Sequence, residues 1–365
     1  MIEGIIPAEI RDEPAAIRAT LAEARQAAQE AARVLRERGS RRLFVIGNGT
    51  SYHTCLAAAA LHRRRSGPDD PTVIALTAAD FRVYRPSLAP TDAVVGVSAS
   101  GEFRDVVAVF EELAGRLPTI AIVHVPGSTL DRVAALAVQS AGGPSRVPVM
   151  TKTFAATLVA TQLLLAELLG ENQGDRYAAE AAAAADVAEG AIAAAERLVE
   201  PLADALAAAE HLFVVGSGLA SVAAMEAALK LKEMAIVHAE AAESWEMASG
   251  AATIVRPGTI VIALAPEGPG REATLDVARH AAGWGARVVE VGPGGTPAVD
   301  GADHLPLPAD AAEDHAPLVA VPPVALLAFA LARRRGHDPD HPGWVERYHS
   351  QGLRHIVGVG EEEGR

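Results

Sequence analysis

Residues 43–49 read Leu-Phe-Val-Ile-Gly-Asn-Gly, and residues 212–218 read Leu-Phe-Val-Val-Gly-Ser-Gly. Each segment is a short apolar run that ends in Gly-x-Gly, and an alanine-rich stretch of helical character follows it. Further strand-like segments pair at nearly the same spacing: 92–98 with 258–264, and 118–124 with 285–291. A nearly constant offset across three pairs of segments indicates a duplicated domain.

Within each half, short apolar strands alternate with longer helical stretches. This alternation predicts βαβ units, and therefore an α/β fold in which helices cover both faces of a parallel sheet. We expect two tandem doubly wound (flavodoxin-like) αβα sandwiches, and single long helices over 14–38 and 171–200. The predicted parts are an N-terminal helical segment at 1–40, a first domain at 41–172, a linking helix at 173–200, a second domain at 201–335 and a tail at 336–365.

Composition narrows the classes of partner. The chain has 365 residues, and its 46 acidic against 32 basic side chains give a net charge of −14. Such a surface repels phosphate backbones, so no nucleic-acid partner is expected, although a local site can still bind a small anion. The single cysteine excludes an internal disulfide framework and a cysteine-based zinc site. The N-terminus lacks the features of a signal peptide and no long apolar run occurs, so we expect a cytoplasmic protein without a membrane span.

Two loops of the first half have the character of an anion site. They read Gly47-Asn-Gly-Thr-Ser51 and Ser98-Ala-Ser-Gly-Glu102, and each leads into a predicted helix. Ligands of open parallel sheets bind at the carboxyl ends of the strands, where such loops offer hydroxyls, backbone N–H groups and helix dipoles. The alternative is that these hydroxyls only cap helices. The matching loops of the second half contain fewer hydroxyls, so we expect one anion site per chain, in the first half. A dinucleotide fingerprint is disfavoured because Tyr52 stands in its last glycine position.

The order of motifs carries a family resemblance. GNGTSYH, DFR, SASGE, PGSTL, MTKTF and ALKLKE follow one another along the chain. This order resembles the sugar isomerase (SIS) domain family, and more closely the isomerase half of glucosamine-6-phosphate synthase with its deaminase and deglycase relatives. The resemblance implies two SIS domains in one chain, a homodimer with its active site near the interface, a tail over that site and a sugar phosphate as substrate. It assigns the phosphate contacts to the first-half loops: Gly49, Thr50, Ser51, Ser98, Ala99 and Ser100.

The resemblance also assigns the proton transfer between C1 and C2 of an open-chain sugar. Glu233 matches the enolising base, since this step needs a carboxylate beside the carbon acid. The pair Glu226–Lys230 has the spacing of an ion pair on a helix surface. Glu246 keeps an acidic position of the family pattern, but Ser249 replaces the histidine that opens the sugar ring. His355 stands in the tail where relatives carry a lysine, and can serve either as a substitute acid–base group or as a solvated side chain.

Other positions depart from the family pattern. Phe103 replaces a phosphate-binding threonine, and Met150 replaces a serine, which makes that edge of the pocket more apolar. Arg146 either compensates as an anion ligand or is an ordinary surface arginine, and Lys152 opens a third candidate helix at the site. No histidine or acidic cluster has the spacing of a metal site, so neither a metal nor a cofactor is expected.

Two functions remain open on this basis. The first is an enzyme with atypical catalytic residues that isomerises a sugar phosphate, or deaminates or deglycates an amino-sugar phosphate or an Amadori-type adduct. The second is a phosphosugar-binding sensor that has lost the chemistry. The absence of a predicted output module before the first strand favours the enzyme.

Overall fold

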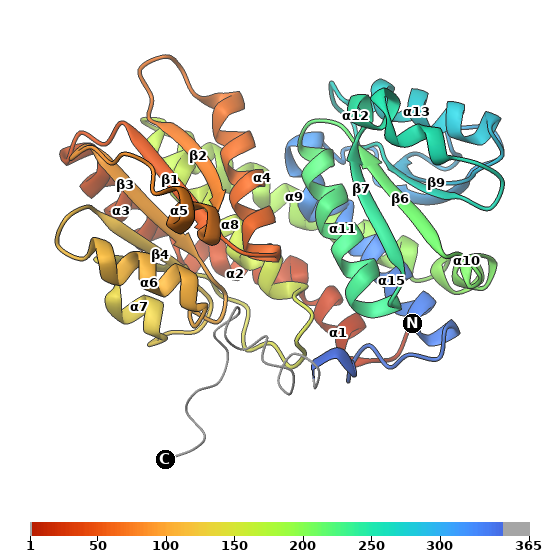
Figure 1. Ribbon diagram of the computed structural model, residues 1–365, viewed down its shortest axis with the longest axis horizontal. Helices are drawn as coiled ribbons and strands as arrows, with labels where there is room; N and C mark the ends of the chain where they lie inside the picture. Colours follow the sequence, from red (N-terminus) through yellow and green to blue (C-terminus); the bar gives the residue numbers. More distant parts are fainter. Residues whose placement is uncertain (1, 346–365) are drawn as a thin grey trace. The chain divides into compact units, whose positions relative to one another are not determined.

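The structure is a computed structural model that describes residues 2–345 (Figure 1). Its contacts divide the chain into two compact units, each built around one sheet. We call them the N-sheet unit, which holds residues 15–145 and 152–182, and the C-sheet unit, which holds residues 2–14, 146–151 and 183–342. Each unit is described by itself.

The sheet of the N-sheet unit has five parallel strands in the order β2-β1-β3-β4-β5. Its strands are β1 (Arg42–Gly47), β2 (Thr72–Thr77), β3 (Asp92–Val97), β4 (Thr119–Val123) and β5 (Leu136–Gln139). The central strands are almost continuously buried, because helices cover both of their faces.

Helices pack on both faces of this first sheet (Figure 1). The helices of this unit are α2 (Glu13–Glu23), whose first two residues belong to the C-sheet unit, α3 (Arg25–Glu37), α4 (Thr50–Arg65), α5 (Ala78–Tyr84), α6 (Arg104–Leu113), α7 (Thr129–Val133), α8 (Lys152–Leu168) and the first part of α9 (Gln173–Ala195). Helix α6 shows why they pack: its buried residues, Val106, Val109, Phe110 and Leu113, recur at helical spacing and form one apolar stripe. A Cβ on Gly96 of β3 would lie 2.6 Å from the Phe110 ring, so this glycine allows the close approach of helix and strand.

The C-sheet unit repeats the plan, with the strand order β10-β9-β8-β6-β7. Its strands are β6 (His211–Gly216), β7 (His238–Glu243), β8 (Ile260–Leu264), β9 (Arg287–Pro293) and β10 (Asp303–Leu307). Its helical elements are α1 (Ile5–Arg11), α10 (Val199–Leu206), α11 (Leu219–Ala235), α12 (Ser244–Ser249), η1 (Ala251–Ile254), α13 (Arg271–Gly283), η2 (Glu313–His315), α14 (Ala316–Val319) and α15 (Val321–Arg334). Read from β7, the order matches that of the first sheet, so β6 corresponds to β1 and β8 to β3.

The predicted fold class is confirmed: two parallel five-stranded sheets with flanking helices form two doubly wound halves. The prediction of a single helix over 14–38 is wrong, because α2 ends at Glu23 and α3 begins at Arg25. The stretch 171–200 is also divided, since α9 ends at Ala195 and α10 starts at Val199.

One apolar helical stretch has the length of a membrane span. Among the described residues, only 313–334 is long and apolar enough, and its apolar window is buried entirely inside the protein. Burial accounts for this composition, since a helix that is covered on all sides can be apolar on all sides.

Candidate functional site

The first loop of the site joins β1 to α4. Gly49 has φ +54° and ψ −127°, a conformation that side-chain-bearing residues rarely adopt, and it turns the chain directly into the helix. The amide of Ser51 donates to the carbonyl of Asn48 at 3.1 Å, and the amide of Tyr52 donates to that of Gly49 at 2.9 Å. Thr50 and Ser51 are buried in the first turn of α4. The loop therefore places two hydroxyl-bearing residues at the positive end of a helix.

The second loop joins β3 to α6. Ser98 is buried, its amide donates to the carbonyl of Ile122 at 3.0 Å, and its Oγ accepts from the amide of Gly101 at 3.1 Å. Ser100 is exposed, and its Oγ accepts from the amide of Glu102 at 3.3 Å. The carbonyl of Ala99 accepts from the amide of His124 at 3.0 Å, which ties the loop to the end of β4. These bonds hold the loop in one conformation.

The two loops lie at one edge of one sheet. Strands β1 and β3 are neighbours with parallel register, so their carboxyl ends meet on the same side. The strand order reverses between them, and ligands of doubly wound sheets bind at this switch point. The residues predicted for phosphate contact in these loops therefore lie at one edge of the sheet, and their contact with a phosphate stays a prediction.

Ser128 is a further hydroxyl that the sequence analysis did not select. It precedes α7, and a Cβ built on Gly101 would lie 2.0 Å from its Oγ. The Oγ is buried and has no hydrogen-bond partner among the residues that the structure describes. The signal was present in the motif PGSTL, but only the tertiary structure brings this serine against the loop of Ser98.

The two basic candidates differ in their surroundings. Lys152 is buried at the start of α8, and its Nζ donates to the carbonyl of Pro144 at 3.2 Å. The side chain of Arg146 is 55% exposed, and its Nε lies 3.8 Å from the carboxylate of the buried Glu9. The amide of Arg146 donates to the same carboxylate at 2.6 Å. Arg146 is thus partly engaged inside the C-sheet unit.

Glu233 belongs to a chain of charges along α11 in the C-sheet unit. Lys230 Nζ lies 2.7 Å from Glu233 Oε2 and 3.1 Å from Glu226 Oε1. The prediction that Glu226 and Lys230 form a surface pair is wrong, because their side chains are 0% and 1% exposed, whereas that of Glu233 is 24% exposed. The pair lies on the inner face of α11. Through Lys230 it holds the carboxylate of the partly accessible Glu233 in place. Burial lowers the pKa of Lys230, but the carboxylates of Glu226 and Glu233 outweigh it and keep the ammonium charged.

Glu13 adds a second buried acid beside this lysine. Burial raises the pKa of Glu13 well above its ordinary value, Lys230 opposes this, and the nearby carboxylates of Glu226 and Glu9 raise it further. Glu13 therefore keeps its proton at pH values where an exposed glutamate is ionised. The sequence carries no signal for this, because a glutamate at a helix start is ordinarily a solvated residue.

The remaining catalytic candidates are less enclosed. Glu246 is exposed on α12, and its amide donates to Glu243 Oε2 at 3.2 Å. Ser249 is also exposed, and its Oγ donates to the carbonyl of Trp245 at 2.7 Å. This bond is internal to the helix, so it gives the hydroxyl no basic partner. His355 lies outside the described residues.

Metal ligation has no visible basis in the part of the chain described. Within residues 2–345, no group of three or more histidine, cysteine, aspartate or glutamate side chains could hold a metal ion.

Taken together, the fold and the two loops define a doubly wound protein of two similar halves, with hydroxyl-bearing loops at the switch point of the first half. The model of the SIS domain matches residues 38–167 and 205–329, so the chain belongs to the SIS domain family.

Three relatives illustrate the likeness. A protein of Methanothermobacter thermautotrophicus described as glutamine–fructose-6-phosphate aminotransferase [isomerizing] is 31% identical over 92% of this chain and 55% of its own length. The chain thus spans about half the length of the curated relatives it matches. The C-terminal domain of the Francisella tularensis glucosamine-fructose-6-phosphate aminotransferase superposes with a TM-score of 0.84 at 24% identity, over 93% of this chain and 99% of that one. Tagatose-6-phosphate ketose/aldose isomerase of Escherichia coli gives 0.79 at 20%, over 93% and 97%, and these two solved structures show the common fold.

Proposed function

We propose that the chain is a phosphosugar-processing enzyme in which Glu233 moves a proton between C1 and C2 of an open-chain sugar phosphate. The reaction is an aldose–ketose isomerisation, or the deamination or deglycation of an amino-sugar phosphate or Amadori-type adduct. The observation that carries the proposal is the hydroxyl-bearing edge at the switch point between β1 and β3. Membership of a family whose relatives are named for phosphosugar chemistry supports the same conclusion.

Each candidate residue has a role in this proposal. The loops at 49–51 and 98–100 bind the phosphate through hydroxyls and backbone N–H groups, and Lys152 and Arg146 are the candidate positive charges for the same anion. Glu233 is the base, because it is the accessible end of an otherwise buried ion-pair chain. Glu246 and His355 are the candidate acid–base groups that replace the absent ring-opening histidine. We also propose a cytoplasmic homodimer with the active site near its interface.

Binding is tested by thermal unfolding against a panel of ligands. Sugar 6-phosphates, amino-sugar phosphates and phosphorylated Amadori adducts are each compared with their unphosphorylated forms. A ligand at about 100 times its dissociation constant stabilises the folded state by about 2.7 kcal/mol. Stabilisation that requires the phosphate supports the anion site, and the best ligand becomes the first substrate to assay. A panel in which no phosphorylated compound raises the unfolding midpoint contradicts the proposal.

The base is tested with Glu233→Gln once a substrate has been found. The amide keeps the shape of the side chain but cannot accept the proton, so turnover falls by about a hundredfold or more while the dissociation constant changes little. Glu210→Gln is the matched control, because Glu210 is an exposed glutamate of the same unit. Near-normal turnover in Glu233→Gln removes this residue from the mechanism.

A binding protein without catalysis is the second candidate. The observation that favours it is Ser249, whose hydroxyl is engaged with the Trp245 carbonyl and has no basic partner in that bond. NMR of the sugar carbons measures whether any sugar of the panel is converted. Phosphate-dependent binding without conversion of any of these sugars identifies this alternative.

A further inference from the structure

The carboxyl ends of β6 and β8 repeat the backbone of the phosphate edge. Gly218 has φ +58° and ψ −131° before α11, close to the angles of Gly49 before α4. The amide of Ala265 donates to the carbonyl of Val291 in β9 at 2.8 Å, as the amide of Ser98 does to Ile122 in β4. The switch point between β6 and β8 therefore has the same construction as that between β1 and β3.

A carboxylate of the chain itself occupies this second edge. Glu313 is 4% exposed, and its Oε2 accepts from the amide of Gly270, which precedes α13, at 2.7 Å. A Cβ built on Gly218 would lie 2.1 Å from Glu313 Oε1, and one on Gly268 would lie 2.4 Å from Glu313 Cβ. The side chain of Glu313 thus lies between the two loops, at the start of two long helices.

The other groups at this edge are of the kind that anion sites use. Ser217 lies in the loop before α11, is 5% exposed, and its Oγ has no hydrogen-bond partner in the described part of the chain. Its Cβ would lie 2.7 Å from a Cβ on Gly270, so this buried hydroxyl side chain faces the residue whose amide binds Glu313. The edge therefore combines a bound carboxylate, an unpartnered hydroxyl and two helix N-termini.

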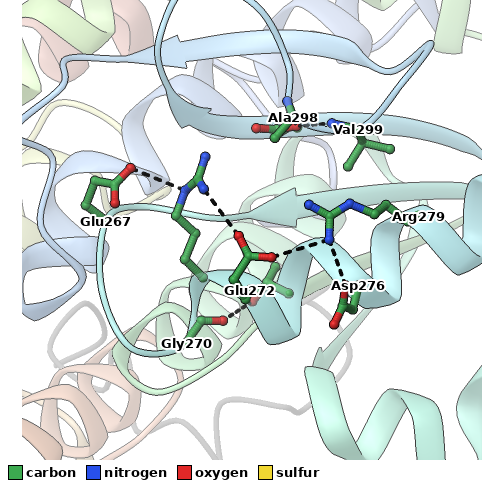
Figure 2. A network of polar contacts seen from close by, with 10 residues as sticks. Glu267, Gly270, Glu272, Asp276, Arg279, Ala298 and Val299 are labelled. Carbon is green, nitrogen blue, oxygen red and sulfur yellow. Dashed lines mark hydrogen bonds and ion pairs between the residues drawn. The ribbon is translucent and has the colours of Figure 1, made fainter.

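Arg271, the first residue of α13, also forms ion pairs with acids of the chain. Arg271 Nε lies 3.4 Å from Glu267 Oε1, and its Nη1 lies 3.7 Å from Glu272 Oε1. Figure 2 shows these contacts continuing from Glu272 to Arg279 and Asp276 along α13. The positive groups of the second edge are thus compensated from within the chain.

We propose that the carboxyl ends of β6 and β8 form a second anion site, suited to a small carboxylate or a phosphate, which Glu313 fills as an internal ligand. This deepens the proposed function, because it gives the reason that one chain takes one external anion. The inference itself rests only on contacts within the C-sheet unit.

The test is the variant Glu313→Ala, which removes the internal ligand and leaves space for an external one. We expect the thermal midpoint to fall by about 5 °C or more, because the Gly270 amide and both helix starts lose a charged partner. Acetate or inorganic phosphate, compared with chloride at equal ionic strength, should recover a large part of this loss. Isothermal titration with inorganic phosphate should find one more binding site in the variant than in the unmodified protein.

Two further variants separate this explanation from a general loss of packing. Glu313→Gln keeps the volume of the side chain, so the edge stays blocked and no additional phosphate site is expected. Glu267→Ala removes a neighbouring carboxylate that is 55% exposed, and should show no anion-specific recovery. If Glu313→Ala does not fold in chloride, its refolding yield is measured in acetate against chloride, and a higher yield in acetate supports the proposal.

The inference is overturned if Glu313→Ala matches the unmodified protein in stability and phosphate stoichiometry, or if it is destabilised without any response to anions. Its failure can be told apart from failure of the proposed function. Phosphate binding by the unmodified chain tests the first edge, whereas the difference in stoichiometry between the variant and the unmodified chain tests the second.

Discussion

The edge at β1 and β3 and the edge at β6 and β8 have nearly the same backbone conformation. They differ in the polar groups that lie at the helix N-termini. In the first, Ser98, Ser100, Thr50 and Ser51 surround the switch point with hydroxyls. In the second, the equivalent of Ser98 is Ala265, and the chain supplies the carboxylate of Glu313. The comparison shows that two copies of one backbone plan differ in the side chains at the carboxyl ends of their strands: hydroxyl groups in the first copy, and a buried carboxylate in the second.

The largest effects are expected from substitution of the two equivalent glycines, Gly49 before α4 and Gly218 before α11. We expect Gly49→Ala to cost about 1–3 kcal/mol, because a Cβ is strained at its backbone angles although nothing lies within 4 Å of it. Gly218→Ala suffers similar strain and also drives its methyl group into Glu313 Oε1, so it should be the more destabilising of the two. Urea unfolding of both variants measures the difference. Equal losses would mean that Glu313 moves aside freely, which is inconsistent with a tightly filled second edge.

The hydroxyls of the first edge come next in expected effect. Ser98→Ala removes a buried hydroxyl from the loop, and we expect the affinity for a phosphorylated ligand to fall by about tenfold, the loss of one hydrogen bond to a charged group. Ala265→Ser makes the reverse change in the second edge and is the control, since Glu313 still blocks that edge. Titration calorimetry on both variants gives the affinity and the stoichiometry. An unchanged affinity in Ser98→Ala would assign the serine to helix capping alone.

Glu13, a buried acid of the C-sheet unit, gives an effect that depends on pH. Burial first, and then the carboxylates of Glu226 and Glu9, raise the pKa of Glu13 from its ordinary value of 4.5, and Lys230 only partly opposes them. The folded state therefore keeps a proton that the unfolded chain releases, so the stability that this proton contributes is present in acid and is lost as the pH rises from about 4.5 towards the folded pKa.

The variant Glu13→Gln removes this dependence. Its thermal midpoint, relative to that of the unmodified protein, should rise as the pH increases above about 4.5 towards the folded pKa of Glu13. Glu23→Gln is the control, since Glu23 is an exposed glutamate of the same helix. A difference between Glu13→Gln and the unmodified protein that is independent of pH would show that the folded chain does not hold the proton.

Much of the fold was accessible from the sequence because it depends on local patterns. The repeat of Leu-Phe-Val-Ile-Gly-Asn-Gly as Leu-Phe-Val-Val-Gly-Ser-Gly predicted both sheets, since apolar strands that end in a glycine turn fold in the same way wherever they occur. The two hydroxyl-rich loops could also be predicted, because each directly follows a predicted strand and is a local feature of the sequence. The break between Glu23 and Arg25 was missed because alanine and charged residues continue the helical pattern through it.

What the sequence by itself determined is therefore the duplicated parallel sheet, the Gly-x-Gly turns and the hydroxyl-rich edge, all of which follow from short-range chemistry. Only the tertiary structure decided which charges are buried and what they face. Glu226 and Lys230 have the spacing of a surface pair, yet α11 turns them inward, and Glu313 lies 43 positions beyond the amide of Gly270 that it binds. Contacts between residues distant in sequence depend on how helices and loops pack on the sheet, and no local pattern encodes that packing.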